Sequence, residues 1–269
     1  MRQVNSSPAE DPYELVSPLL ELAEDWPPLS QGENIPLELA LHELRSRGDW
    51  RLSIYRTPKE IEGVSIVMPH ADWYLEALRP PVAEMLSNMA VIHGRRPSTL
   101  TTSQRVGEWL RPFLLETGGI VAESGARLLR CTKALDASKG RWATADDLPN
   151  LREYEKKIDP DQKRHMDTSW EVLVALMQLA VFTSEDSIVA SMRRYGPAPS
   201  YAGISDLFVL PEVRRNKVAR KLTGFVVGEL LAKRKAVYVL VDENDTSTLT
   251  FYRDSGFEDQ GAFYRADLE

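Results

Sequence analysis

ISDLFVLPEVRRNKVARKL, residues 204–222, joins a strand pattern to a helix pattern through a short turn. Leu207 and Val209 mark every second position of a predicted strand, which a proline ends. Asp206 and Phe208 fill the positions between them. The helix that follows begins with unpaired backbone N–H groups and a partial positive charge. The turn before it is therefore suited to bind phosphate.

The charges around this turn differ from those of the rest of the chain. The 269 residues carry a formal net charge of -7, whereas residues 201–240 hold more bases than acids. A basic region in an acidic protein favours a specific polyanionic ligand over general nucleic-acid binding, and a solvated basic helix face is the alternative. The eight bases are Arg214, Arg215, Lys217, Arg220, Lys221, Lys233, Arg234 and Lys235, against Asp206, Glu212 and Glu229.

Strand and helix patterns alternate on both sides of this segment, which predicts an α/β (α+β) fold with mixed, mostly antiparallel sheets flanked by helices. In the second half we expect a strand and helix over 141–157, strands over 176–182, 188–194, 236–242 and 261–268, and helices over 218–234 and 245–256. In the first half we expect helices over 12–26, 35–48, 71–78, 80–89 and 102–118, an antiparallel pair of strands over 49–56 and 63–69, and a strand over 126–135. The short polar stretch 136–140 is the expected linker between a domain of residues 1–135 and one of residues 141–269.

The segment VLPEVRRNKVARKL resembles the acyl-CoA-binding motif of the GNAT acyltransferase superfamily, P-E followed by [RQ]-x-x-G-x-[GA]-x-x-L. Arg214, Ala219 and Leu222 fit that motif. Lys217 replaces the family glycine, so it either strains the turn or adds its own charge to a phosphate. The resemblance implies that the turn holds the CoA pyrophosphate and that the preceding strand pairs with the pantetheine amides. The residues implied are Leu207, Phe208, Val209, Arg214, Arg215, Asn216, Lys217, Val218, Ala219 and Arg220.

A second segment, VYVLVDENDTSTLTFYRDSGF, resembles the family's next strand and helix. Tyr252 then takes the place of a tyrosine that donates a proton to the departing CoA thiolate, although a tyrosine in an amphipathic helix can also be a packing residue. The family asparagine falls on Asp245, or on Asn244 after a slip of one residue, and both are candidate CoA contacts.

The general base is less defined. Some family members have a glutamate early on the strand at 201–209, where this chain has Ala202, Gly203, Ile204 and Ser205. Asp206 is the candidate base, and Glu153, Glu155 or a chain of waters are the alternatives.

These matches imply an acetyl-CoA-dependent N-acetyltransferase in which an amine attacks the thioester directly, with a backbone N–H near Val209 polarising the carbonyl. The first half lacks the motif, so the chain resembles family members with a degenerate GNAT-like domain before a working one. That domain would shape the acceptor pocket or pack as an internal pseudo-dimer. A non-catalytic CoA-binding sensor or interaction module is the rival interpretation.

The composition excludes several classes. With 43% hydrophobic and 27% charged residues, the chain is neither disordered nor built for a membrane, and its N-terminus lacks the apolar core of a secretion signal. We therefore expect a cytoplasmic protein, a monomer or homodimer, that binds no membrane and no nucleic acid. Cys131 is the single cysteine and reads as a structural thiol, and the four histidines are far apart, so no metal is expected.

Overall fold

The computed structural model describes residues 2–5, 26, 34–43, 51–68, 72–92, 97–117, 119–136, 138–158, 168–196 and 198–268. Contacts between residues divide the chain into two units. Unit 1 comprises Met1–Leu128, Leu240–Leu249 and Gln260–Glu269, and unit 2 comprises Leu129–Val239 and Thr250–Asp259. The units are therefore interleaved along the chain, and each is described by itself below.

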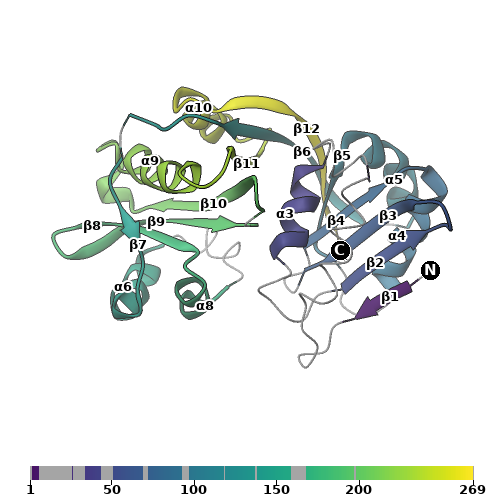
Figure 1. Cartoon of the computed structure of the whole chain (residues 1–269), viewed down its shortest axis with the longest axis horizontal. Helices are drawn as coiled ribbons and strands as arrows, with labels where there is room; N and C mark the ends of the chain where they lie inside the picture. The colour runs from purple at the N-terminus through teal and green to yellow at the C-terminus, as the bar shows by residue number, and fades with distance from the viewer. Residues whose placement is uncertain are drawn as a thin grey trace. The chain divides into compact units, whose positions relative to one another are not determined.

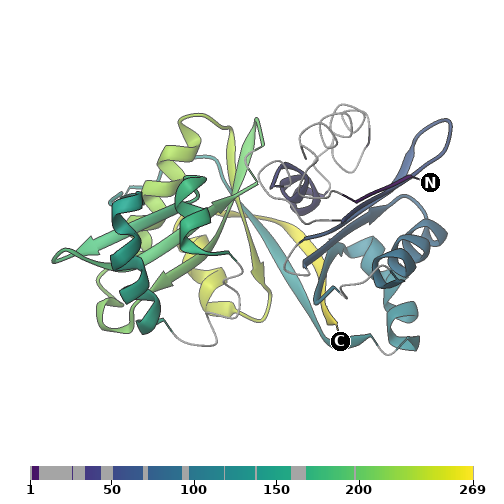
Figure 2. The same ribbon diagram turned by 90° about the horizontal axis from the view of Figure 1, so that it is seen from below.

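Unit 1 is a mixed sheet with helices on both faces (Figure 1). The strand order is β1-β2-β3-β4-β5-β12-β6, with β4 and β5 parallel and β2, β3 and β4 successively antiparallel. α3 packs on one face, whereas α4 and α5 pack on the other, as the turned view shows (Figure 2). The elements are β1 (Arg2–Asn5), α3 (Ile35–Glu43), β2 (Arg51–Arg56), β3 (Ile61–Val67), β4 (Asp72–Ala77), α4 (Pro80–Ile92), β5 (Thr99–Ser103), α5 (Gln104–Glu116), most of β6 (Ile120–Cys131) and β12 (Glu258–Leu268).

The last strand of the chain lies inside the sheet of unit 1. β12 pairs antiparallel with β5, from Phe263 opposite Ser103 to Asp267 opposite Thr99. A Cβ at Gly107 would lie 2.2 Å from the Tyr264 ring, so this glycine lets β12 approach α5. β12 is thus held by both pairing and packing.

Unit 2 is a smaller sheet in the order β11-β10-β9-β8-β7. α9 covers one face of β8, β9 and β10, and α6 and α8 cover the other (Figures 1 and 2). The elements are β7 (Arg141–Trp142), the 3-10 helix η2 (Ala145–Asp147), α6 (Leu148–Lys157), α8 (Trp170–Ala175), β8 (Leu179–Ser184), β9 (Ser187–Tyr195), β10 (Tyr201–Val209), the 3-10 helix η3 (Pro211–Val213), α9 (Val218–Leu231), β11 (Ala236–Asp242) and the later part of α10 (Thr246–Asp254).

The α/β fold with helix-flanked sheets is as predicted, and most expected elements are present. The prediction of a helix over 71–78 is wrong, because this stretch is strand β4 between β3 and β5. Trp73, Leu75 and Ala77 alternate along it and are buried, which is the two-residue period of a strand. β5 and α8 were not predicted, and the expected helix over 12–26 lies outside the described residues except for Trp26. The linker at 136–140, between domains of residues 1–135 and 141–269, stays a prediction.

Candidate functional site

The parallel strands β10 and β11 stop pairing at the candidate site. β10 pairs with β11 only from Tyr201 to Gly203, yet β10 continues to Val209. Beyond Gly203, the edge of β10 that faced β11 has no strand partner in the described structure. An unpaired strand edge offers N–H and C=O groups to an extended ligand.

A β-bulge reshapes β10 at this opening. Ser205 lies opposite Arg193 and Phe208 opposite Ser191, so two residues of β10 face one residue of β9. The first bulged residue, Asp206, has a φ of 52° in the left-handed region. The bulge overturns the simple alternation expected for residues 206–209: the Phe208 side chain is buried. The bulge instead directs the Asp206 side chain to the face that α6 and α8 cover.

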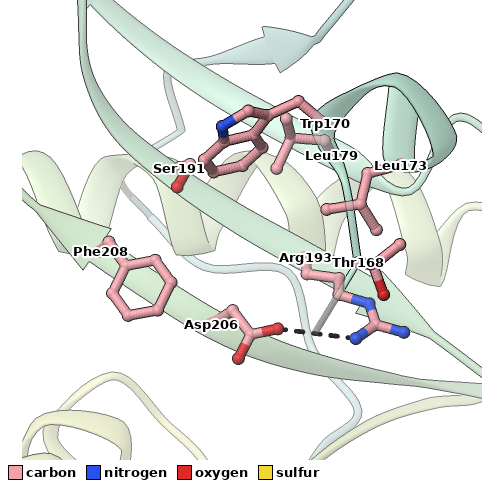
Figure 3. A pocket seen from close by; sticks show the side chains of 8 residues that line it. All are labelled: Thr168, Trp170, Leu173, Leu179, Ser191, Arg193, Asp206 and Phe208. Atoms are coloured by element: carbon pink, nitrogen blue, oxygen red, sulfur yellow. Dashed lines mark ion pairs between the residues drawn. The ribbon is translucent and has the colours of Figure 1, made fainter. Parts of the chain in front are cut away.

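The Asp206 carboxylate lines a narrow pocket (Figure 3). It accepts a hydrogen bond from the Ser205 hydroxyl (3.1 Å) and forms an ion pair with Arg193 at 3.7 Å. The pocket has room for about one water molecule. Its lining is apolar apart from Asp206, Arg193 and two hydroxyls, and consists of Thr168, Trp170, Leu173, Leu179, Ser191, Arg193, Asp206 and Phe208.

Tyr154 of α6 reaches β10 beside this pocket. Its hydroxyl donates to the carbonyl oxygen of Phe208 (3.0 Å) and lies 3.2 Å from Ser191 Oγ. The side chain is buried, and its ring packs against Trp170 at a centroid distance of 6.3 Å. Burial raises the pKa of the Tyr154 phenol well above its usual range, so the hydroxyl keeps its proton.

The basic turn after β10 has a special backbone. Arg215 and Lys217 both have positive φ, 71° and 58°, and Lys217 is the N-cap of α9. In the described part of the chain, the first-turn amides of α9, those of Val218, Ala219 and Arg220, have no acceptor. The turn therefore leaves backbone donors without an acceptor in the described structure.

The four cationic side chains of the turn differ in their contacts. Arg214 Nε donates to the carbonyl of Val209 (3.1 Å), and Arg220 donates to the carbonyl of Asp254 at the end of α10 (2.9 Å). The exposed side chains of Arg215 and Lys217 have no polar partner among the described residues. Two cations thus brace the turn, and two face solvent.

Tyr252 lies near the end of α10, where the chain turns sharply. The N–H of Phe257 donates to the carbonyl of Tyr252 and that of Gly256 to the carbonyl of Arg253, with Gly256 at a φ of 95°. This is a Schellman motif, completed by contact of the Tyr252 and Phe257 rings (5.1 Å). Burial raises the pKa of the Tyr252 phenol well above its usual range. The nearby Asp206 carboxylate and Tyr195 hydroxyl act in the same direction.

Residues 158–267 match the model of the acetyltransferase (GNAT) domain. This match includes strands β10 and β11, the basic turn after β10 and Tyr252. This part of the chain, residues 158–267, is a GNAT-family domain. This confirms the resemblance drawn from residues 204–257 and assigns the chain, at the level of the family, to the acyltransferases. A search of curated protein sequences finds no match.

Solved GNAT structures cover almost the whole chain at low sequence identity. A GNAT-family acetyltransferase from Colwellia psychrerythraea is 12% identical, with all of both chains covered and a TM-score of 0.56. A GCN5-related N-acetyltransferase from Sphaerobacter thermophilus is 15% identical, with 99% of this chain and 95% of that one covered and a TM-score of 0.58. A tandem GNAT protein from the clavulanic acid biosynthesis pathway is also 15% identical, with 99% and 98% covered and a TM-score of 0.58. At these identities, the likeness shows the fold.

The structure brings some of the GNAT site candidates together. Asp206 and Tyr252 are close enough to interact electrostatically, and β10 runs directly into the turn of residues 214–220. Asp245 is the N-cap of α10, since its Oδ1 accepts from the amide of Thr248 (3.0 Å), and the Asn244 amide donates to Asp242 Oδ1. Both belong to the stretch Leu240–Leu249 of unit 1, and their contact with CoA stays a prediction.

The alternative bases on α6 are engaged elsewhere. Glu153 is exposed and pairs with Lys156 (2.6 Å), and Glu155 accepts a hydrogen bond from the Trp170 indole (3.1 Å). Gly203, at the strand position near the family glutamate, lies under the Tyr195 ring, which a Cβ would approach to 2.4 Å. This packing leaves no space for a carboxylate at Gly203. Asp206, on the same strand, stays the candidate general base.

Tyr154, Ser191 and Arg193 were not predicted as site residues. The only sequence signal for Tyr154 is its place with Leu151 on the apolar face of α6, which indicates burial but not the partner of the hydroxyl. Cys131 is buried, its thiol donates to the carbonyl of Lys133, and burial raises its pKa. Among the described residues, no three His, Cys, Asp or Glu side chains form a metal-binding group, and no described helix is long and apolar enough to cross a membrane.

Proposed function

We propose that this protein is an acetyl-CoA-dependent N-acetyltransferase that transfers an acetyl group to a primary amine by direct attack. The observation that carries the proposal is the strand edge of β10 that opens after Gly203 and leads straight into a basic turn with free amides. An extended amide-bearing arm followed by a pyrophosphate is the ligand shape that such a surface suits. Acetyl-CoA would supply the activated thioester.

The turn fits a diphosphate despite Lys217. Its backbone is already left-handed at this position, a conformation that favours glycine, so the side chain does not prevent the turn. Lys217 and Arg215 are exposed and without polar partners in the described structure, and would add charge beside the amides of Val218 and Ala219. Arg214 would act mainly by holding the turn to Val209.

Three groups divide the chemistry in this proposal. The amide of Val209, on the open edge, polarises the thioester carbonyl. Asp206, in the pocket beside it, takes a proton from the amine directly or through water, and Tyr252 gives its proton to the departing thiolate. Because burial holds the pKa of Tyr252 high, the phenol is protonated at neutral pH, as a proton donor must be.

The alternative is a GNAT-fold module that binds CoA without turnover. Two observations favour it: the Tyr195 ring fills the space at Gly203 where a base could stand, and the Tyr252 side chain is only 3% exposed. The cytoplasmic location, the monomeric or homodimeric state, the lack of nucleic-acid binding and the domains at 1–135 and 141–269 remain predictions.

Thermal unfolding with acetyl-CoA, CoA and ATP tests the binding step. Acetyl-CoA and CoA at about 100 times their Kd should each raise the free energy of unfolding by about 2.7 kcal/mol. ATP should have little effect, because it lacks the pantetheine arm. The absence of a shift with both CoA species contradicts the proposal.

Release of CoA thiol with a panel of amines tests catalysis. Tyr252→Phe should lower kcat by about 10² or more while acetyl-CoA affinity changes little. Arg214→Ala should mainly weaken acetyl-CoA binding. Binding without thiol release for any amine would favour the non-catalytic module.

A further inference from the structure

We propose that Tyr154 is a positioning residue: its hydroxyl holds the peptide group between Phe208 and Val209 so that the Val209 N–H points at the thioester carbonyl. This inference rests on the proposed acetyl-CoA site and extends it to a residue of α6 outside the motifs. Tyr154 does not touch the reacting atoms in this assignment; it acts through the backbone of β10.

The direction of the hydrogen bonds follows from the number of protons. The Phe208 carbonyl can only accept, so the single proton of the Tyr154 hydroxyl is donated to it, at 3.0 Å. Ser191 Oγ, 3.2 Å away, must then donate to the Tyr154 oxygen. Ser191, Tyr154 and the Phe208 carbonyl thus form a chain of two hydrogen bonds.

Peptide planarity transmits this contact to the next residue. The peptide bond is trans, so the Phe208 carbonyl and the Val209 N–H lie in one plane and point in opposite directions. The adjacent Leu210 amide bonds to Val189 of β9, which puts the Val209 N–H on the other edge of β10. That edge lost its β11 partner at Gly203.

The bulge explains why such a support is needed. Asp206 and Leu207 are the two bulged residues, and they interrupt the regular ladder between β9 and β10 just before this peptide. The Arg214 side chain holds the Val209 carbonyl from the turn. Tyr154 holds the preceding peptide group through the Phe208 carbonyl. Side chains from outside the strand therefore hold the peptide groups on both sides of Val209.

The ring of Tyr154 is itself fixed. It is 2% exposed and packs against Trp170, whose indole N–H is bonded to Glu155 (3.1 Å). A donor with a locked rotamer is pre-organised, which is the condition for electrostatic stabilisation by a backbone N–H.

The infrared band of bound acetyl-CoA labelled with ¹³C at the thioester carbonyl tests the inference without an acceptor. A hydrogen bond from Val209 lowers the carbonyl frequency of bound relative to free acetyl-CoA. In Tyr154→Phe, which keeps the ring, we expect this shift to shrink by about half or more while Kd stays within about threefold. The same shift in the wild type and in Tyr154→Phe overturns the inference.

Ser191→Ala is the matched control. It removes the other partner of the Tyr154 hydroxyl but leaves the bond to the Phe208 carbonyl, so the wild-type shift should persist. An equal loss in both variants would mean that Tyr154 acts through general packing, and the inference would fall. Failure of the wild type to bind acetyl-CoA is a separate result that defeats the proposed function.

A second measurement on the wild type covers the case in which Tyr154→Phe does not fold. The amide proton of Val209 in ¹⁵N-valine-labelled protein should move downfield with acetyl-CoA and less with CoA, which lacks the carbonyl. Identical positions with the two ligands contradict the assignment of this amide.

Discussion

Lys217 and Arg215 show that a turn without glycine can adopt left-handed backbone angles. Both have left-handed backbone angles, which cost about 1 kcal/mol or more for a residue with a Cβ. Lys217 also leaves its ammonium exposed beside the free amides of α9. The two interpretations of Lys217 from the sequence, strain and added charge, are therefore compatible with each other.

Lys217→Gly separates these effects. Relief of the backbone strain should raise the free energy of unfolding by up to about 1 kcal/mol, less the larger entropy of glycine in the unfolded chain. Loss of the charge should weaken acetyl-CoA binding, most strongly at low salt. Thermal unfolding measures the stability, and titration with acetyl-CoA at two ionic strengths measures the affinity. The control variant Lys217→Ala keeps the backbone strain, so it should lose affinity without gaining stability. Unchanged affinity in both variants would remove the phosphate role of this lysine.

The buried phenol of Tyr252 makes stability depend on alkaline pH. Its pKa is raised in the folded protein, so the stabilisation of the neutral form is complete below the unfolded value of about 10. It is lost as the pH rises above that value, by at most about 1.4 kcal/mol per pH unit for each such phenol. Denaturant unfolding between pH 7 and 12 measures this effect. Above pH 10, the free energy of unfolding of Tyr252→Phe should fall less steeply with pH than that of the wild type. A constant difference across the range would mean that Tyr252 ionises normally.

At the scale of elements, the end of α10 depends on one glycine. Gly256 has a φ of 95°, and the nearest atom to an added Cβ, from Leu135, is 3.7 Å away. Its backbone conformation, rather than lack of space, thus requires glycine there. The same motif fixes the turn of α10 that carries Tyr252.

Gly256→Ala should therefore lower the free energy of unfolding by about 1–2 kcal/mol. Gly228→Ala, in the last turn of α9, is the matched control: nothing lies within 4 Å of its added Cβ. It should raise the free energy by about 0.5–1 kcal/mol. Denaturant unfolding measures both, and a similar effect of the two substitutions would show that φ at Gly256 is not restrictive.

The elements that sequence periodicity identified are those with a simple pattern. β2, β3, β9 and α9 are in their expected places, and the motifs of residues 204–257 lie within the family match. The helix prediction over 71–78 fails because strand β4 also buries a charged residue: Glu76 is bonded to Asn34 (2.7 Å) and Arg105 (3.1 Å). Such long-range partners leave no local signal.

The bulge at Asp206 and the Tyr154 contact were missed for a related reason. A bulge depends on the register between two strands, and the Tyr154 bond spans 54 residues. Neither follows from the spacing of apolar residues within one segment. The motif predicts where the site lies, whereas the contacts around it could be found only in the structure.

At the scale of the whole molecule, the two units share the chain in an interleaved order. β12, at the end of the sequence, belongs to the unit made mainly of the first 128 residues. Besides its pairing with β5, the Tyr264 hydroxyl donates to Glu123 (2.7 Å), which Arg111 also holds. Cutting the chain between its halves would therefore take a strand away from unit 1.

A chain truncated after Phe257 should lose the stability of unit 1 before that of unit 2. The β5 edge would be unpaired, so its amides should exchange hydrogen much faster, while those in β8 and β9 keep their protection. Hydrogen exchange followed by mass spectrometry measures this, with Tyr264→Phe as the control that removes only the hydroxyl bond. Unchanged protection of β5 would contradict the role of β12.

The place of β12 also has a consequence for biosynthesis. A ribosome adding about 5–20 residues per second needs roughly eight to thirty seconds to pass from β5 to β12. During that interval, the nascent chain carries an open strand edge that β12 has yet to close. Unit 1, which begins to emerge first, is thus completed after unit 2, and its yield in the cell should depend on chaperones that shield this edge until β12 has been synthesised.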